Sequence, residues 1–527
     1  MLKKRYKSRM RGVIRGHIKL KKSKKLSKIP NLKRLLATSE INYERNSFSS
    51  FIMGKNTSSA QREICIRQYL VLRLSTHKLN ETLLLQEGNK KNKIIYPLPA
   101  DWVKKIEDSG YIVAKNWSEV LWRGYLFLLI GYSVLQYFKI IFYSILKIFS
   151  GRKEEPYVFF SNLNKNNLPI KDKLNESFDI VSWYIKNYSG KMNFKNIKHD
   201  SHNPDIEMNS DITIKYSKLG AVIPLYGLKN IIIFLTWGFC AISIAFFDLL
   251  RGKWQHPFIL NQAILAKQLS LLDTANLAKE YLFHNTNQAY RPLWTYDAES
   301  RGSKITLYFY STNVEGIKND PTFAFKCMSW PRYLVWNSYQ ADFIRRSTEK
   351  NKEIQIANPI WFSDNATESL NIQHNSIALF GITPHRLTQY SKYAEEIEYV
   401  TATNSIAFIK DIVDIAETKN LQSVMKSKRN LERWFVHPRF LHFFNNELVN
   451  LNVSILNPTI SPHRIIDASK MVISFPFTAT ALIAKDLGKP SCFYDPANFI
   501  KKNHNAAHGI PIISSKINLS KWISENC

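Results

Sequence analysis

The chain has 527 residues and a mass of 61.3 kDa, which exceeds one ordinary hydrophobic core and predicts two main domains with appendages. The 73 Lys and Arg residues against 42 Asp and Glu residues give a formal net charge of +31, so we expect a polyanionic partner: nucleic acid, acidic lipid or nucleotide phosphates. The five cysteines are scattered and never in a CxxC spacing, which excludes a disulfide scaffold and a Cys-rich zinc site and fits a reducing compartment.

The first 36 residues contain about fifteen Lys and Arg residues and no acid. Like charges at this density repel, so residues 1–57 are interpreted as a basic extension that is disordered or helical only on a surface. A solvated tail, an RNA-binding arm and a lipid-binding arm are all open. We favour anionic lipid, because two apolar segments follow and nothing downstream resembles a nucleic-acid-binding motif.

Those apolar segments run from Gly124 to Phe149 and from Ile231 to Phe247. A bilayer-spanning helix needs about 20 apolar residues, so two spans, a shallow pair on one membrane face and two buried core helices are all compatible with their length. The shallow pair is favoured because the sequence between them is typical of a soluble fold. There, Tyr157–Leu163 and Phe178–Tyr184 are predicted to be strands.

Further along, Pro257–Phe283 predicts a long helix and Lys304–Thr312 a strand. From Ser376 onward, short apolar runs alternate with amphipathic helices, which indicates a parallel sheet wrapped by helices. We therefore expect a domain boundary near residue 370, with domains at 58–370 and 371–527. The first apolar segment of any length begins only around residue 120, so no secretory signal is expected and the bulk of the protein is predicted to be cytoplasmic.

The sharpest feature is the segment from Met471 to Pro496, in which an apolar strand, MVIS, runs into Pro-Phe-Thr-Ala-Thr and then a helix capped by Gly488. This order places Thr478 and Thr480 at a helix N-terminus above the carboxyl edge of a parallel sheet. Free backbone N–H groups and the helix dipole favour an anion there, and a phosphate group is the anion that we expect. The alternative is that Thr480 only caps the helix.

Several common signatures are absent from the sequence. No phosphate-binding GxxxxGK[ST] loop, no GxGxxG and no HExxH occurs. The stretch His199–His202 has metal-binding residue types, but its polar context indicates a loop. We expect no metal site.

The Pro-Phe-Thr-Ala segment resembles the polysaccharide-biosynthesis proteins named for a Pro-Phe-Thr-Ser motif, with Ala479 in the fourth position. The resemblance covers about residues 90–515, and the stretches that carry it are 291–313, 333–343, 382–386, 425–429 and 461–496. It implies an α/β fold similar to GT-B glycosyltransferases: two Rossmann-like domains face a cleft, and the C-terminal one holds a nucleotide sugar. Loss of the serine hydroxyl removes one phosphate contact, for which Thr480 is a substitute.

Within this frame, the resemblance gives candidate nucleotide-binding roles to Thr478, Thr480, Pro476, Phe477, His437, Arg464, His463, Lys426 and Arg386. His437-Pro438 resembles the His-Pro element of some sialyl- and Kdo-type transferases, which favours a CMP-linked donor; a plain surface turn is the alternative. Arg464 offers a fork-shaped contact to phosphate or, alternatively, a bridge to Asp467.

Glycosyl transfer also needs a base that takes the proton of the acceptor hydroxyl, and a carboxylate or histidine in the N-terminal domain would serve. Glu299 and Asp297, in a polar turn before a strand, are the first candidates. The alternative is that both are ordinary solvated acids of a surface turn, with no catalytic role. Asp342 comes third.

The sequence thus predicts a glycosyltransferase at the cytoplasmic face of the inner membrane. It would move a sugar from a nucleotide sugar, without a cofactor or metal, to a growing surface polysaccharide or lipid-linked glycan on an anionic membrane, and would bind no nucleic acid. The alternative is a non-catalytic membrane-associated component of a polysaccharide assembly complex.

Overall fold

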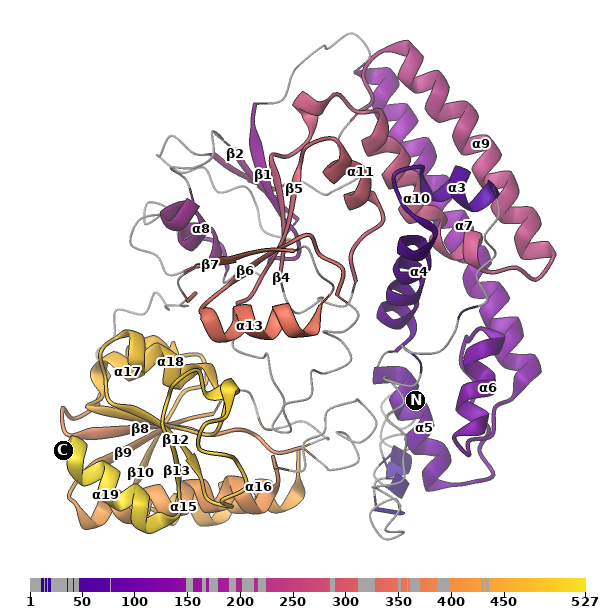
Figure 1. The fold of residues 1–527 in the computed structure, drawn as a ribbon. Helices are drawn as coiled ribbons and strands as arrows, with labels where there is room; N and C mark the ends of the chain where they lie inside the picture. The colour runs from indigo at the N-terminus through magenta and orange to yellow at the C-terminus, as the bar shows by residue number, and fades with distance from the viewer. Residues whose placement is uncertain are drawn as a thin grey trace.

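A computed structural model of the chain (Figure 1) contains two parallel β-sheets, each covered by helices. The residues that it describes are 11–13, 15–16, 18–19, 36, 41, 47–75, 77–147, 155–163, 167–169, 179–188, 196–200, 213–216, 224–284, 290–310, 328–348, 352–357, 359–360, 370–385, 399–427, 431 and 436–527. Most of the predicted basic extension lies outside these residues.

The first sheet has seven strands in the order β3-β2-β1-β4-β5-β6-β7, and every neighbouring pair is parallel. Its strands are β1 (Tyr157–Phe160), β2 (Asn196–His199), β3 (Thr213–Tyr216), β4 (Glu280–His284), β5 (Lys304–Tyr308), β6 (Arg332–Val335) and β7 (Glu353–Ile356). β1 and β6 are buried throughout, as expected for parallel strands covered on both faces.

Helices cover this sheet, and some of them form a separate helical layer beside it. They are α3 (Ser47–Met53), α4 (Ser59–Leu74), α5 (His77–Gly88), α6 (Ala100–Asp108), α7 (Lys115–Leu146), α8 (Ile180–Tyr188), α9 (Leu228–Leu250), α10 (Gln255–Leu271), η4 (Thr274–Asn276), α11 (Trp294–Ser300) and α13 (Ser338–Ser347). α10 packs between α11 on one side and the long helices α7 and α9 on the other, so it joins the helical layer to the sheet.

The second sheet has six parallel strands in the order β10-β9-β8-β11-β12-β13. The strands are β8 (Ser376–Phe380), β9 (Gln422–Lys426), β10 (Val453–Leu456), β11 (Met471–Ser474), β12 (Ser491–Asp495) and β13 (Ile512–Ser514). The helical elements are α15 (Ala402–Thr418), α16 (Pro438–His442), the π-helical η6 (Phe443–Glu447), η7 (Leu448–Asn450), α17 (Pro462–Ala468), α18 (Ala479–Asp486), η8 (Asn505–Ala507) and α19 (Lys516–Asn526).

Both sheets reverse their strand order at one point, between β1 and β4 in the first and between β8 and β11 in the second. In open parallel sheets, ligands bind outside the carboxyl ends of the strands at such a switch point. The two-unit, Rossmann-like α/β organisation of the GT-B-like class is therefore confirmed, and the predicted boundary near residue 370 lies between β7 and β8.

The carboxyl edges of the two sheets meet through α13, which follows β6 and lies between the two sheets in Figure 1. Asn337, the N-cap of α13, donates a hydrogen bond from Nδ2 to His508 Nδ1 over 2.8 Å. The ring of Tyr339 stacks on the same histidine at a centroid distance of 5.6 Å. Because His508 follows β12, these contacts join the two units at the edge where ligands of both sheets are expected.

Three sequence-based predictions of local structure are wrong. Phe178–Tyr184 was expected to be a strand, but α8 begins at Ile180, because Asp179 accepts the backbone N–H and hydroxyl of Ser182 and starts a helix. The helix predicted over Pro257–Phe283 ends at Leu271, and β4 follows. His199, interpreted as part of a loop, is the buried last residue of β2.

The two apolar segments form α7 and α9, the two helices in the described part of the chain that are long and apolar enough to cross a membrane. They pack against each other and against α10, and in Figure 1 the three helices stand side by side at the border of the molecule. Only a third of each apolar window is buried. Both helices therefore keep a broad apolar face exposed to solvent.

Candidate functional site

The Pro-Phe-Thr-Ala-Thr segment connects β11 to α18 at the switch point of the second sheet. The strand pairing continues for one residue beyond β11, because Phe475 N–H donates to Phe380 O over 2.8 Å. The chain then turns sharply at Phe477, whose φ of 65° lies in the left-handed region. A bulky side chain in this region is strained, and such strain persists where the surrounding structure holds it.

The hydroxyl groups of this turn are linked to one another. Thr478 Oγ1 donates to Phe475 O over 2.9 Å and lies 3.2 Å from Thr480 Oγ1, which is 2.8 Å from the buried Ser474 Oγ. The predicted placement of both threonines at the start of α18 is confirmed. The hydroxyls themselves mainly hold the turn in shape.

Thr478 is the N-cap residue of α18, yet its side chain makes no capping hydrogen bond. The first-turn N–H groups of a helix have no partner inside the helix, so an uncapped first turn leaves them to water or a ligand. The first turn also contains no acidic residue. At this end of α18 the backbone N–H groups, rather than the two hydroxyls, are therefore the donors suited to a phosphate.

The segment after β8 forms the other side of the switch point, and the structure brings His437 to it. His437 N–H donates to Pro384 O over 2.9 Å, and Val436 pairs with His385 in an isolated bridge. His437 Nδ1 accepts the N–H of Arg439, so this histidine caps α16. Arg386 lies outside the described residues.

The other basic candidates also lie at or near the carboxyl edge. Lys426 ends β9, next to β8. His463 and Arg464 occupy the first turn of α17, which packs against α18. Both helices run from the carboxyl edge back to the amino edge, so their N-termini lie at the same edge. Burial lowers the pKa of His463, and the nearby Asp467 carboxylate only partly opposes this effect. The His463 ring is therefore neutral at pH 7.

Aromatic contacts connect the motif to the first unit. The Phe477 ring lies 4.8 Å from the ring of His504, which caps η8, and η8 leads directly to His508. Ala479, which stands where the motif has serine, packs against the hydrophobic cluster of the first unit. The motif therefore sits where the two units meet. Sequence reasoning missed His504 and His508, for which the only signal is their place after a predicted strand.

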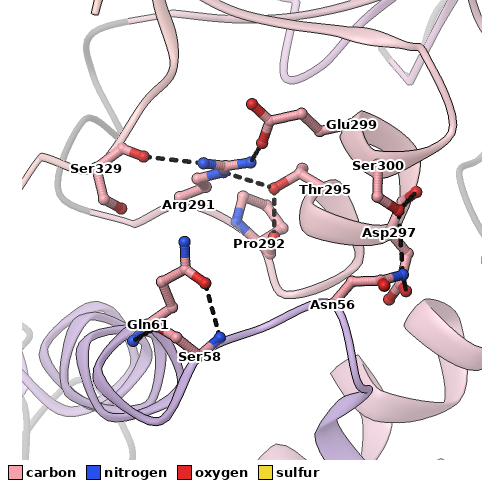
Figure 2. A network of polar contacts seen from close by, with 10 residues as sticks. All are labelled: Asn56, Ser58, Gln61, Arg291, Pro292, Thr295, Asp297, Glu299, Ser300 and Ser329. Atoms are coloured by element: carbon pink, nitrogen blue, oxygen red, sulfur yellow. Dashed lines mark hydrogen bonds and ion pairs between the residues drawn. The ribbon is translucent and has the colours of Figure 1, made fainter. Parts of the chain in front are cut away.

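The two predicted catalytic acids lie elsewhere, in α11 (Figure 2). Glu299 pairs with the buried Arg291, whose guanidinium also donates to Thr295 Oγ1 and Ser329 O. α11 leads into the amino end of β5, opposite the edge that meets the second unit. The structure thus does not bring Glu299 together with the threonines of the motif, and a catalytic role for it stays a prediction.

Asp297 is buried and accepts a hydrogen bond from Asn56 Nδ2 over 2.9 Å. Burial raises the pKa of Asp297, while Asn56, Lys267 and Arg301 oppose that rise. Its observed task is to hold the turn between α3 and α4 against α11, as Figure 2 shows. A catalytic role for Asp297 also stays a prediction.

Asp342, the third candidate, lies on α13 and forms an exposed ion pair of 2.5 Å with Arg345. Among the residues that the structure describes, no cluster of three or more His, Cys, Asp or Glu side chains is arranged to hold a metal ion.

Comparison with solved structures finds glycosyltransferases at low sequence identity. The wall teichoic acid polymerase TagF is 10% identical, with 76% of this chain and 87% of that chain covered and a TM-score of 0.37. SnogD from Streptomyces nogalater is 11% identical, with 71% and 94% covered and a TM-score of 0.32. A UDP-glucosyltransferase from Polygonum tinctorium is 8% identical, with 71% and 90% covered and a TM-score of 0.33.

The sequence matches none of the curated proteins with which it was compared. The family described as "Polysaccharide biosynthesis PFTS motif protein" matches residues 226–523, more than half of the chain. The match includes β4 to β13, and with them the turn at Phe477 and the helix contact at Asn337. The chain therefore belongs to the polysaccharide biosynthesis PFTS motif protein family.

Proposed function

We propose that this protein is a glycosyltransferase that moves a sugar from a nucleotide-sugar donor to a growing surface polysaccharide or lipid-linked glycan. The observation that carries the proposal is the uncapped first turn of α18, which begins within the motif at the switch point of the second sheet. Membership of a polysaccharide biosynthesis family supports the same chemistry. The donor phosphates would lie on this turn, with Lys426, Arg464 and His437 contributing positive charge or hydrogen bonds.

We further propose that the protein works on an anionic membrane surface at the cytoplasmic face. Large apolar side chains point outward from α7 and α9, including Leu128, 70% exposed, and Phe239, 73% exposed. Basic and aromatic residues line a pocket beside this face, where α7 begins and α9 ends: Lys104, Lys115, Arg123, Lys253, Trp122 and Trp254. Glu107 and Glu119 line it too and pair with Lys115 and Arg123, so Lys104 and Lys253 are the cations best placed for lipid phosphates. Such a border suits lipid head groups.

The position of α10 favours helices that lie on the membrane over helices that cross it. α10 packs against both α7 and α9, is largely buried, and leads through η4 into β4, which pairs with β1 in the soluble sheet. If α7 and α9 crossed a bilayer, α10 and its contacts with α11 would have to enter the lipid as well. The half-buried Lys267 of α10 would then lose its remaining water at high cost.

The test of nucleotide binding is a thermal-shift series with CMP, UDP, GDP and dTDP on the purified protein and on Thr478→Asp. An aspartate at an N-cap accepts first-turn N–H groups and adds negative charge where a phosphate would bind. We expect one nucleotide, CMP in first place, to raise the melting temperature of the unaltered protein. Thr478→Asp should still melt cooperatively, because the cap that it gains offsets the lost hydrogen bond to Phe475 O, and it should lose the nucleotide-dependent shift.

Ser58→Asp is the matched control, because Ser58 is the exposed N-cap of α4, a helix of the first unit that lies apart from the second sheet in Figure 1. It adds the same charge at the same helix position and should keep the nucleotide shift. If no nucleotide stabilises a protein that melts cooperatively, the proposal fails. The alternative, a non-catalytic component of an assembly complex, would then be favoured by Ala479 in place of the motif's serine.

A further inference from the structure

A second polar cluster lies at the switch point of the first sheet, where β1 and β4 are neighbours. Asn162 follows β1, Asp200 follows β2 and His284 ends β4, so all three stand at the carboxyl ends of adjacent strands. The carboxyl edge of this sheet meets the second unit through Asn337 and His508. The cluster therefore occupies the place in the first unit that the motif occupies in the second.

Hydrogen bonds connect the three residues in series. Asp200 accepts the backbone N–H of Asn162 and, over 3.3 Å, the hydroxyl of Ser161. Asn162 takes a left-handed φ of 60°, and its carbonyl oxygen lies 3.0 Å from His284 Nε2. Asp200 thereby fixes the left-handed turn at Asn162, whose carbonyl orients the imidazole ring.

The hydrogen bond determines which ring nitrogen carries the proton. A carbonyl oxygen only accepts, so Nε2 of His284 must be the N–H donor. Burial lowers the pKa of His284, although the Asn162 carbonyl opposes this. The ring is thus neutral at pH 7, with its lone pair on Nδ1. Among the described residues, the titratable groups that contact or face it include Tyr308 and Tyr310, whose ring centroids lie 6.1 and 5.5 Å away, and the Asp200 carboxylate beyond the Asn162 peptide.

We infer that His284 is the general base that accepts the proton of the acceptor hydroxyl, and that Asp200 is a positioning residue acting through the Asn162 peptide. This inference rests on the proposed glycosyl transfer. In that step the acceptor O–H bond breaks and the proton passes to Nδ1, while the acceptor oxygen bonds to the anomeric carbon. The bond from that carbon to the donor phosphate oxygen breaks, and its electron pair leaves with the nucleotide.

A purely structural role, tying the end of β4 to the loop after β1, predicts a different result on substitution. His284→Gln separates the two, because the Gln amide still donates to the Asn162 carbonyl but has no basic nitrogen at neutral pH. The assay uses membranes from the producing cells as a source of acceptor and supplies radiolabelled sugars as CMP, UDP, GDP and dTDP conjugates. Incorporated label, its pH dependence and the nucleotide thermal shift are measured on the same preparations.

We expect His284→Gln to lower kcat at least 100-fold with the KM for the donor nearly unchanged, the usual size of a general-base contribution. Its nucleotide shift should be kept. The fall of activity at acid pH should disappear; in the unaltered protein this fall lies below about pH 6.5, the ordinary value for histidine, because burial lowers the pKa of His284. Added imidazole should partly restore the activity of His284→Ala. Asp200→Ala should lower kcat less and retain the acid limb of the profile.

His374→Gln, in the exposed segment before β8, is the matched control and should behave like the unaltered protein. Transfer by His284→Gln within fivefold of the unaltered protein, with the nucleotide shift intact, would overturn the assignment of the base alone. An unaltered protein that shows neither a nucleotide shift nor incorporation overturns the proposed function, and this inference with it.

Discussion

Phe477 joins backbone strain to packing at the centre of the motif. Its φ of 65° disfavours any residue with a Cβ atom, while its ring contacts Phe493 at 5.8 Å and His504 at 4.8 Å. A left-handed conformation costs a bulky residue about 1–2 kcal/mol, which the ring contacts offset. The turn therefore sets the direction in which α18 starts, and it does so with a locally strained backbone at Phe477.

Comparison of Phe477→Gly with Phe477→Ala isolates this strain, because both variants lose the ring and only alanine keeps a Cβ atom. We expect the glycine variant to be the more stable by about 1 kcal/mol in urea unfolding. The control is the same pair of substitutions at Lys521, in the exposed middle of α19. There Lys521→Gly should unfold more easily than Lys521→Ala, by about 1 kcal/mol. Equal stability of the two Phe477 variants would contradict the left-handed turn.

Among the helices, α3, α9 and α10 are tied together by a buried Ser-His-Asp chain. His256 Nδ1 lies 2.5 Å from Asp248 Oδ2, and its Nε2 lies 2.9 Å from Ser49 Oγ. The order of contacts is that of a hydrolytic triad, but Ser49 is 1% exposed, so no substrate reaches its hydroxyl. The three side chains instead satisfy one another's hydrogen bonds in the buried region where the apolar helix α9 ends and α10 begins.

The exposed apolar faces of α7 and α9 are predicted to bind the membrane surface. Replacing Leu128 or Phe239 with Glu removes apolar contact and adds a charge that anionic lipid repels. We expect each change to lower partitioning into vesicles of phosphatidylglycerol and phosphatidylcholine at least tenfold in a sedimentation assay, with the nucleotide shift kept. Ile517→Glu is the matched control, because Ile517 is 81% exposed on α19 in the second unit. Equal binding by all variants would refute a membrane role for these faces.

Across the molecule, the contact of His508 with Asn337 and Tyr339 joins the two units. Burial, helped by the charge of Lys485, lowers the pKa of His508 to about 4. The amide Nδ2 of Asn337 donates to Nδ1, which requires a neutral ring at this nitrogen. His508 also adopts a left-handed φ of 53°.

This contact predicts a pH dependence of stability. Between about pH 4 and 6.5 the unfolded histidine binds a proton that the folded one does not, so stability is complete above pH 6.5 and is lost as the pH falls towards 4. The maximum loss is roughly 3 kcal/mol. His508→Asn tolerates the left-handed backbone and still accepts from Asn337, so calorimetry should show a flatter pH profile. An unchanged profile would exclude His508 as its source.

Much of the second unit follows from local pattern. Runs such as MVIS and SCFYD are short, mostly apolar and separated by helices, so their burial in a parallel sheet and the start of α18 after Thr478 were both predictable. The first unit was less predictable. Phe178–Tyr184 is as apolar as a strand, and its local helix signal is the Asp179 cap. His284 was hidden because its strand was interpreted as the end of a helix.

Composition, periodicity and the motif were sufficient to predict the fold class and the family, because these depend on residues that are neighbours along the chain. The anion site that they also predict stays a proposal. Which distant side chains meet was decided only by the tertiary structure. Glu299 and Asp297 are held by Arg291 and Asn56, partners that sequence order does not reveal. The two switch points likewise exist only once the strands are ordered in space, because pairing across a sheet joins segments far apart in sequence.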